Sequence, residues 1–398
     1  MKKLSAIFVL LLVAASMGFA AGGQDAGTPA PAAKGGVVVT EWEVPFLNSL
    51  TGPIAAIGEF LQWGAEYAAK EINAAGGIAG KPVKVTGVDT ALDPQKGSVE
   101  MARIVEKSLV AMGPVPEPVI MAAMPIAVEA GMVSITATTS YEYASKFFPW
   151  TVSWFPPTLD RLPPLVVAWA KQYPDMKKVV QFIEPYGPWP GMAGAHTSAL
   201  KSLSITEAAA VDVPSDSVTF GPLVVKALEQ NPDGVILVTN AEKAAKIIKE
   251  LKSRGWTKMD HILVFSSADD AQLYATGGAD INGVMVYNYL NLEISNPRWD
   301  KFKKEFAAAH NGNPPFSLSP NYYDALYMIK EAIEKTGVTG DPKKLKEERK
   351  LISDYIANVQ AFKGLLFDWN MKNGIPTNKP TYIFQIVDCK KKLVKEVK

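Results

Sequence analysis

Short β-rich runs alternate with longer amphipathic runs after residue 36, and this alternation limits the fold more than any other feature of the chain. Val37–Phe46 and Val83–Val88 predict strands, whereas Gly58–Ala75 carries apolar residues at helical spacing. A helix between two strands of one sheet forms a βαβ unit, in which the strands are parallel. We therefore predict an α/β fold with parallel sheets.

A second α/β set follows the first along the chain. The proline-containing string Trp154–Pro157 separates the two sets, and proline is poorly tolerated inside either regular element. We therefore expect a linker at this string and two lobes, one from each set. The second set comprises predicted strands at Val179–Ile183, Gly234–Thr239, His261–Phe265 and Gly283–Tyr287, with a helix at Ala241–Arg254.

The first 36 residues predict export. Met1–Ala20 has a basic start, a short apolar run and a small-x-small ending, which is typical of a cleaved signal peptide. The apolar run is shorter than the roughly 20 residues that a membrane-spanning helix needs. Ala21–Gly36 is rich in Pro, Gly and small residues and predicts a flexible leader. We expect a periplasmic protein that is not inserted in the membrane once the signal is removed.

The charge balance and the motifs exclude several classes of function. Lys plus Arg is 41 and Asp plus Glu is 40, a net charge of +1, so nucleic acid is not an expected partner. The single cysteine and three widely spaced histidines predict neither a disulfide nor a metal site. No G-x-S-x-G or G-x-G-x-x-G motif occurs. We expect no catalytic residues, no metal and no cofactor, and hence a protein that is not an enzyme.

Several strings, in order along the chain, resemble the branched-chain-amino-acid type of periplasmic substrate-binding protein that serves ABC importers. The match lies in their ordered sum and spans essentially the whole mature chain. They are Leu50–Gly58, Gly64-Ala65, Glu71–Gly80, Asp93-Pro94, Gly113–Val115, Ser134–Thr138, Tyr323–Ala325, and Gly364–Asp368 with Gly374.

The resemblance implies two Rossmann-like lobes joined by three crossover linkers. By the family's pattern, lobe 1 would comprise 37–156 plus 290–365, and lobe 2 would comprise 157–289 plus 366–398. A small metabolite, amino-acid-like or another small carboxylate or amide, would bind in the cleft between the lobes and be delivered to the membrane permease subunits of an importer. A ligand-sensing receptor of the same fold and a secreted α/β hydrolase are the alternatives.

The resemblance also implies ligand contacts in lobe 1. In the family, the loop after Gly113–Val115 presents a small hydroxyl residue to the ligand carboxylate, and Glu117 occupies that position here. A carboxylate about 4 Å away would be repelled by ~4 kcal/mol at an effective dielectric of 20, roughly a thousandfold in affinity. Either Glu117 points away, or it pairs with a cationic ligand group, or the ligand is not an ordinary α-amino acid.

Four further lobe 1 positions and the alternatives for them follow from the same match. Thr136, Ala137 and Thr138 match the strand-end segment that contacts ligand in the family through its backbone and hydroxyls. Ordinary local hydrogen bonding of these hydroxyls is the alternative. Ile57 matches a position that is often aromatic, so the pocket wall there would be aliphatic.

In lobe 2, the resemblance implies an aromatic lid and polar contacts. Tyr186 or Trp189 would cover the ligand, although ordinary loop packing is the alternative for each. Asn240 would supply a polar contact after its strand. Asp269 is the candidate for binding a ligand amine, but if the family's glutamate corresponds to Ala268, that group is missing.

Overall fold

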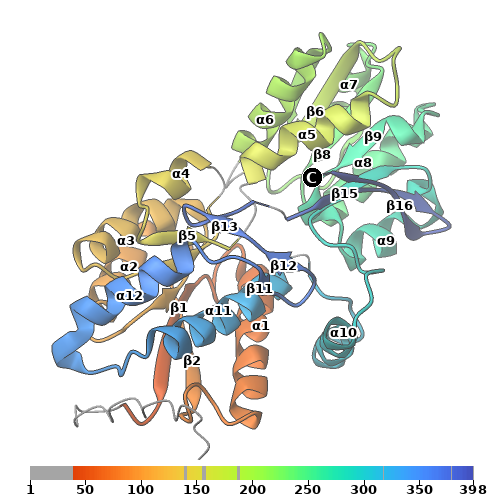
Figure 1. The fold of residues 1–398 in the computed structure, drawn as a ribbon. Coiled ribbons are helices and arrows are strands. Elements are labelled where there is room, and N and C mark those ends of the chain that lie inside the picture. The colour runs from red at the N-terminus through yellow and green to blue at the C-terminus, as the bar shows by residue number, and fades with distance from the viewer. Residues whose placement is uncertain are drawn as a thin grey trace, which may run out of the picture. The chain divides into compact units, whose positions relative to one another are not determined.

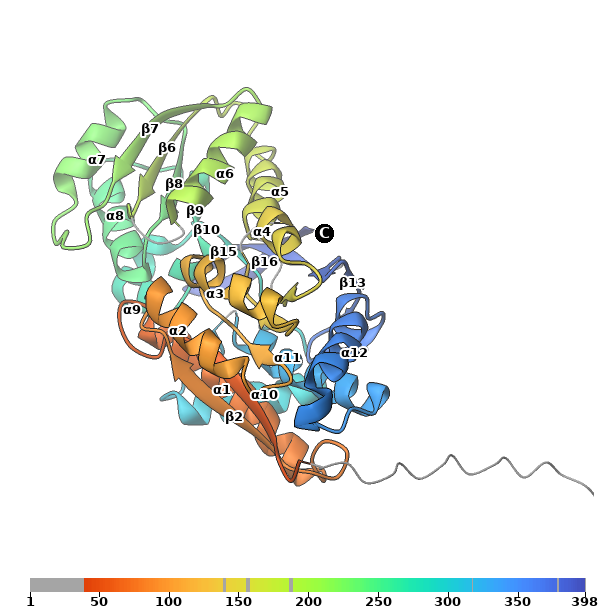
Figure 2. The ribbon, with the colours of Figure 1, turned by 90° about the vertical axis from the view of Figure 1, so that its left-hand side faces the viewer.

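A computed structural model of the chain describes residues 39–138, 141–154, 158–185, 189–316, 318–377 and 379–397. These residues form two main β-sheets, each with its own helices. In Figures 1 and 2 the strands coloured red to yellow form one sheet, and the green strands with the dark-blue C-terminal strands form the other. The predicted signal peptide (1–20) and leader (21–36) lie outside the described residues.

The first sheet is parallel throughout, as predicted. Its strand order is β2-β1-β3-β4-β5, and each neighbouring pair runs in the same direction. The strands are β1 (Trp42–Asn48), β2 (Val83–Asp89), β3 (Ala111–Met112), β4 (Ser134–Thr136) and β5 (Thr151–Ser153). The helices between them are α1 (Ala55–Ala74), α2 (Pro94–Ile104), α3 (Glu117–Glu129) and α4 (Tyr141–Lys146).

Alternating side chains give each face of the first sheet its own core. Phe46 and Ile135 belong to the core that contains the apolar residues of α1. Leu47 and Ala111, each next in sequence to a residue of that first core (Phe46 and Met112), belong to the core that contains the apolar residues of α2 and α3. Successive strand residues point to opposite faces, so a sheet covered on both sides reads as a continuous apolar run.

The second sheet is parallel from β7 to β10 and ends in an antiparallel hairpin. Its strand order is β16-β15-β10-β9-β8-β6-β7. The strands are β6 (Lys178–Ile183), β7 (Thr206–Asp212), β8 (Gly234–Val238), β9 (Ile262–Val264), β10 (Met285–Asn288), β15 (Thr381–Val387) and β16 (Lys390–Val397). The helices are α5 (Thr158–Ala170), α6 (Trp189–Ser202), α7 (Gly221–Leu228), α8 (Ala241–Ser253) and α9 (Ala271–Gly277).

The tail packs differently from the prediction. The predicted division assigned 366–398 to lobe 2, but Trp369 and Met371 are buried in the core of the first sheet, and the Ser153 amide donates to the Gly374 carbonyl at 2.9 Å. The third passage between the sheets therefore lies after residue 376 and not at 365. The elements concerned are α10 (Pro297–Ala309), α11 (Ser319–Thr336), α12 (Leu345–Ala357), β11 (Phe362–Lys363), β12 (Asp368–Trp369), β13 (Met371–Lys372) and β14 (Ile375–Pro376).

In the part of the chain that the structure describes, no helix combines the length and the apolar character required to cross a membrane.

Candidate ligand-binding site

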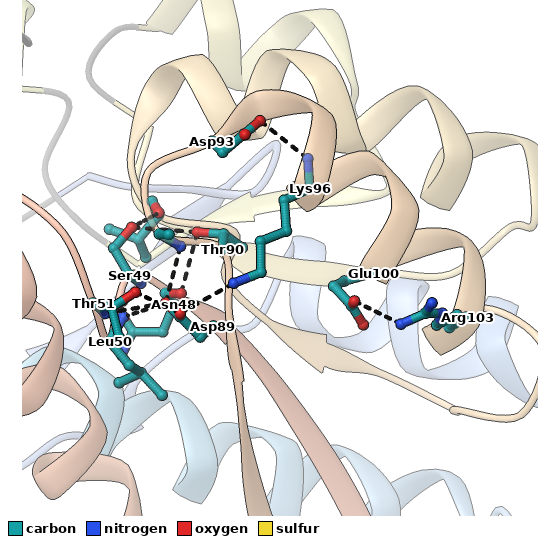
Figure 3. Close-up of polar contacts among 12 residues, drawn as sticks. Asn48, Ser49, Leu50, Thr51, Asp89, Thr90, Asp93, Lys96, Glu100 and Arg103 are labelled. Atoms are coloured by element: carbon teal, nitrogen blue, oxygen red, sulfur yellow. Dashed lines mark hydrogen bonds and ion pairs between the residues drawn. The ribbon is translucent and has the colours of Figure 1, made fainter.

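The carboxyl ends of β1 and β2 carry a buried polar cluster (Figure 3). The Ser49 hydroxyl lies 3.3 Å from the Thr90 hydroxyl and donates to the Val115 carbonyl at 3.3 Å. Thr90 in turn donates to the Asn48 carbonyl at 3.1 Å, and the Asn48 amide donates to the Gly58 carbonyl at 2.8 Å. These bonds join the loops after three neighbouring strands, at the edge of a parallel sheet where ligands bind in open α/β folds.

Asp89 organises the outer side of this cluster (Figure 3). Its carboxylate accepts hydrogen bonds from the Leu50 amide at 2.9 Å, the Ala91 amide at 2.9 Å and the Thr51 hydroxyl at 2.7 Å, and it pairs with Lys96 at 3.1 Å. Burial raises the pKa of Asp89, but these donors outweigh burial and hold the pKa well below its usual range. Asp89 is therefore charged, and it fixes the loop after β1.

Two glycines let the backbone approach closely at this edge. A Cβ at Gly58 would lie 2.0 Å from the Ser49 carbonyl oxygen, and a Cβ at Gly113 would lie 2.0 Å from the Leu47 carbonyl oxygen. Gly113 also has a φ of +77°, which favours glycine. Both glycines are required for α1 and the loop after β3 to pack against the end of β1.

Two threonine hydroxyls at the end of β4 are buried but lack a hydrogen-bond partner among the described residues. Thr136 is 0% exposed and Thr138 is 1% exposed. Most buried polar atoms in proteins are hydrogen-bonded, so such a pair needs an explanation. The Gly113 amide donates to the Ile135 carbonyl at 2.7 Å, which places the loop after β3 beside the threonine segment.

The other predicted residues of lobe 1 have different environments. Ile57, in the first turn of α1, and Ala137 are half-buried and pack against the core of the first sheet. Glu117 is half-buried and is the first residue of α3, where the helix dipole stabilises a carboxylate. The position of Glu117 at the start of α3 thus explains an acidic residue there without a ligand. The roles of Ile57, Ala137 and Glu117 toward a ligand stay predictions.

In lobe 2, the Asn240 side chain has partners within the lobe. It caps α8 by accepting a bond from the Lys243 amide at 3.0 Å, and its own amide donates to Glu184 at 3.1 Å. The Lys243 ammonium lies 2.6 Å from the Glu184 carboxylate, and this ion pair is almost completely buried. Lys243 also donates to the carbonyls of Pro214 and Ser215, both at 3.0 Å. This group ties the ends of β6 and β8 to the loop after β7.

Asp269 also has internal partners on both carboxylate oxygens. Oδ1 accepts a hydrogen bond from the Tyr274 hydroxyl at 2.8 Å, whereas Oδ2 accepts from the Asn288 amide at 2.5 Å and lies 2.7 Å from the Lys391 ammonium. The side chain of Asp269 is 0% exposed. These contacts join α9, β10 and β16. Binding of a ligand amine by Asp269 would compete with them, and that role stays a prediction.

The predicted aromatic lid is only partly described. Trp189 is the first residue of α6, is half-buried and packs against a core of the second sheet. Tyr186 lies outside the described residues.

The sequence interpretation missed the residues that support these edges, namely Asn48, Ser49, Asp89 and Thr90 in lobe 1 and Glu184 and Lys243 in lobe 2. The string Leu50–Gly58 pointed to the first loop, but no local pattern identifies partners about 40 to 60 residues apart. Within the described ranges, no three His, Cys, Asp or Glu side chains are grouped so that they could hold a metal ion.

Comparison with known proteins decides the family. The family described as periplasmic binding protein matches residues 41–391, far more than half of the chain. The chain belongs to the periplasmic binding protein family. Within it, the chain is of the branched-chain amino acid type, as its sequence strings predicted. The solved neighbours show the type I periplasmic binding protein fold, with two α/β lobes.

Curated and solved relatives differ in what they bind. The Leu/Ile/Val-binding protein homolog 3 of Brucella melitensis is 25% identical over 295 residues, covering 73% of this chain and 78% of that protein. The branched-chain amino acid transporter substrate-binding protein LivJ of Streptococcus pneumoniae, solved with isoleucine, has a TM-score of 0.72 and 19% identity, covering 89% of this chain and 99% of that one. An ABC transporter solute-binding protein of R. palustris, solved with benzoate, has a TM-score of 0.73 and 18% identity, covering 90% and 96%.

The family assignment carries two general statements. Members of the family are binding proteins for small solutes, and they work outside the cytoplasm. The signal peptide at 1–20 stays a prediction.

Proposed function

We propose that this periplasmic binding protein captures a small metabolite at the carboxyl edge of the first sheet and delivers it to the permease subunits of an ABC importer without changing it chemically. The observation that carries the proposal is the pair of buried threonine hydroxyls, Thr136 and Thr138, at the end of β4. A hydroxyl without a partner in a buried position is stabilised when a ligand oxygen or amide supplies the missing hydrogen bond.

The proposed mechanism is a shift between open and closed arrangements of the lobes. The first lobe would bind the ligand through Thr136, Thr138 and the backbone at Ala137, with Ile57 as an aliphatic wall. The second lobe would close over it through Trp189 and Tyr186. A ligand that contacts both lobes binds the closed arrangement better, and its differential affinity drives closure.

The expected ligand is amino-acid-like or another small carboxylate or amide. Because the loop after β3 lies beside the threonine segment, Glu117 would act on whatever group binds there. A negative charge at that position favours a ligand whose carboxylate is balanced by an ammonium group, or one that carries an amide in its place. Leucine and benzoate represent the balanced and unbalanced cases.

A thermal-shift screen tests the proposed function. The probes are leucine, isoleucine, valine, leucinamide, benzoate and benzamide, each added to the purified mature chain. A probe at 100 times its dissociation constant stabilises the folded protein by about 2.7 kcal/mol, which raises the melting temperature measurably. We expect at least one probe to do so and to be recovered unaltered. Chemical conversion of a bound probe, or no shift with any of the six, would contradict the proposal.

Glu117→Gln sharpens the assignment of the ligand class. If Glu117 faces the ligand, removing its charge raises the affinity for benzoate relative to benzamide, and for leucine relative to leucinamide. Glu129→Gln, at the other end of the same helix, is the matched control. An affinity ratio within each pair that Glu117→Gln leaves unchanged would show that Glu117 points away from the ligand.

A further inference from the structure

Two of the connections between the sheets meet at one tryptophan of the first lobe. The Trp154 ring stacks on the Trp369 ring with centroids 4.6 Å apart and an interplanar angle of 16°. The Lys379 ammonium lies 4.1 Å from the centroid of the same Trp369 ring. We call Trp154, Trp369 and Lys379 the tryptophan–lysine stack.

The stack lies at the start of both connections. Trp154 directly follows β5 of the first sheet, and the next helix, α5, packs on the second sheet. Lys379 stands two residues before β15, which is a strand of the second sheet. Trp369 itself belongs to the first core and is 1% exposed. Lys379 and Trp154, which stand at the third and first connections, therefore both contact the Trp369 ring.

Lys379 is a buried charged residue whose ammonium has specific partners on α11. Lys379 is 4% exposed, and its ammonium donates a hydrogen bond to the Asn321 side-chain oxygen on α11. The Asp324 carboxylate, one turn along α11, attracts it and itself accepts a bond from the Leu365 amide at 2.8 Å. Burial lowers the pKa of Lys379 and raises that of Asp324, whereas the attraction between the two groups favours the charged form of each.

Burying a charge is expensive, and a well-packed apolar residue in its place is often neutral or stabilising. A cation over an aromatic ring, with a single fixed acceptor, gives instead a defined geometry. A contribution to stability therefore does not explain why a lysine occupies position 379. Control of the geometry where the two connections meet does explain it.

We propose that Lys379 is a positioning residue for lobe closure, which holds the first-lobe ends of the first and third connections together at Trp369. This inference rests on the proposed function, in which the two lobes close over a ligand. Both connections then start from one rigid point of the first lobe, and closure is confined to bending beyond that point.

Lys379→Met tests the proposal, because methionine keeps the apolar length of the side chain and removes the cation. Lys372→Met is the matched control, since Lys372 is exposed on the nearby strand β13. In ligand-free protein, we expect amide hydrogen exchange at residues 151–154 and 379–383 to become at least tenfold faster in Lys379→Met and to stay unchanged in Lys372→Met. We also expect X-ray scattering of ligand-free Lys379→Met to give a larger radius of gyration.

The outcome is decided without any ligand. Unchanged exchange in either connection, or an unchanged radius of gyration, would overturn the proposal. Equally faster exchange in α1 and α2 would also overturn it, because that result means general destabilisation of the lobe. A failed probe screen, by contrast, contradicts the proposed function and leaves the exchange result to judge Lys379 separately.

Discussion

Both sheets have internally bonded polar side chains at their carboxyl edges, but the polar side chains that sequence analysis placed at the ligand differ between the two lobes. In the first lobe, Thr136 and Thr138 bury hydroxyls that have no hydrogen-bond partner among the described residues. In the second lobe, the polar side chains that sequence analysis placed at the ligand, Asn240 and Asp269, already have partners inside the lobe. The difference suggests a division of labour, in which the first lobe offers hydrogen bonds to the ligand and the second uses its own to keep its edge rigid.

The largest expected effect comes from breaking the buried ion pair of the second lobe. Lys243→Met leaves the Glu184 carboxylate buried without its cation, and breaking one side of such a pair costs about 3 kcal/mol or more. We expect this loss in the free energy of unfolding measured by urea denaturation. Lys246→Met, which removes an exposed lysine one turn along α8, is the control and should cost less than about 0.5 kcal/mol. Similar losses in the two variants would show that the pair does not stabilise the lobe.

Asp269→Asn tests the internal role of the second predicted residue. The change removes the charge that Lys391 and two other donors share, and we expect the folded protein to lose about 2 kcal/mol of stability. Denaturation of the ligand-free protein measures this directly. A variant as stable as the parent would show that the internal contacts of Asp269 do not stabilise the lobe and would favour a role in ligand binding.

Acid sensitivity should also originate in the second lobe. Burial lowers the pKa of His196 from 6.5 to about 3, and its ring contacts Gln181 at 3.0 Å and the Tyr287 hydroxyl at 3.1 Å. A lowered pKa in the folded state gives stability above the unfolded pKa that is lost as the pH falls. We expect a loss of about 2 kcal/mol between pH 8 and pH 5 from this group.

The matching variant is His196→Gln, which lacks the titrating ring. Its stability should depend less on pH over the same range than that of the parent. Parallel pH profiles for the two proteins would contradict the assignment.

A smaller effect is expected from the cluster that supports the first edge. Ser49→Ala removes a hydroxyl that contacts Thr90 and the Val115 carbonyl, both at 3.3 Å. Because these bonds are long, we expect a loss of about 1 kcal/mol in stability, measured by denaturation. A loss above about 3 kcal/mol would mean that the first edge is as tightly internal as the second.

The sequence predicted several buried strands well because such strands are recognisable as short runs of apolar residues. β1, β2, β6 and β8 were all found within a few residues, and the helix at α8 was found from its apolar stripe. β16 was missed because Lys390–Val397 is rich in lysine. It is an edge strand, where lysine protects the unpaired side from pairing with another chain.

The site was less predictable than the framework. The segment Thr136–Thr138 was predicted through family resemblance, and its burial depends on packing that no local pattern shows. The partners of Asp269 lie 5, 19 and 122 residues away, and the hydrogen-bond acceptor of Lys379, Asn321 on α11, lies 58 residues away. A residue type at a strand end indicates that a polar group is present, whereas only the fold shows whether that group is already occupied.

The most direct test of the comparison is calorimetric titration of Thr138→Val and Asp269→Asn with whichever probe raises the melting temperature of the parent. Thr151→Val is the control, since Thr151 has an equally buried hydroxyl but is the first residue of β5, at the amino edge of the sheet. We expect Thr138→Val to bind the probe about fivefold or more weakly, as the loss of ~1 kcal/mol of hydrogen bonding requires, and the other two variants to keep the parent affinity. Parent affinity in Thr138→Val together with weakened binding in Asp269→Asn would contradict the division of labour between the lobes.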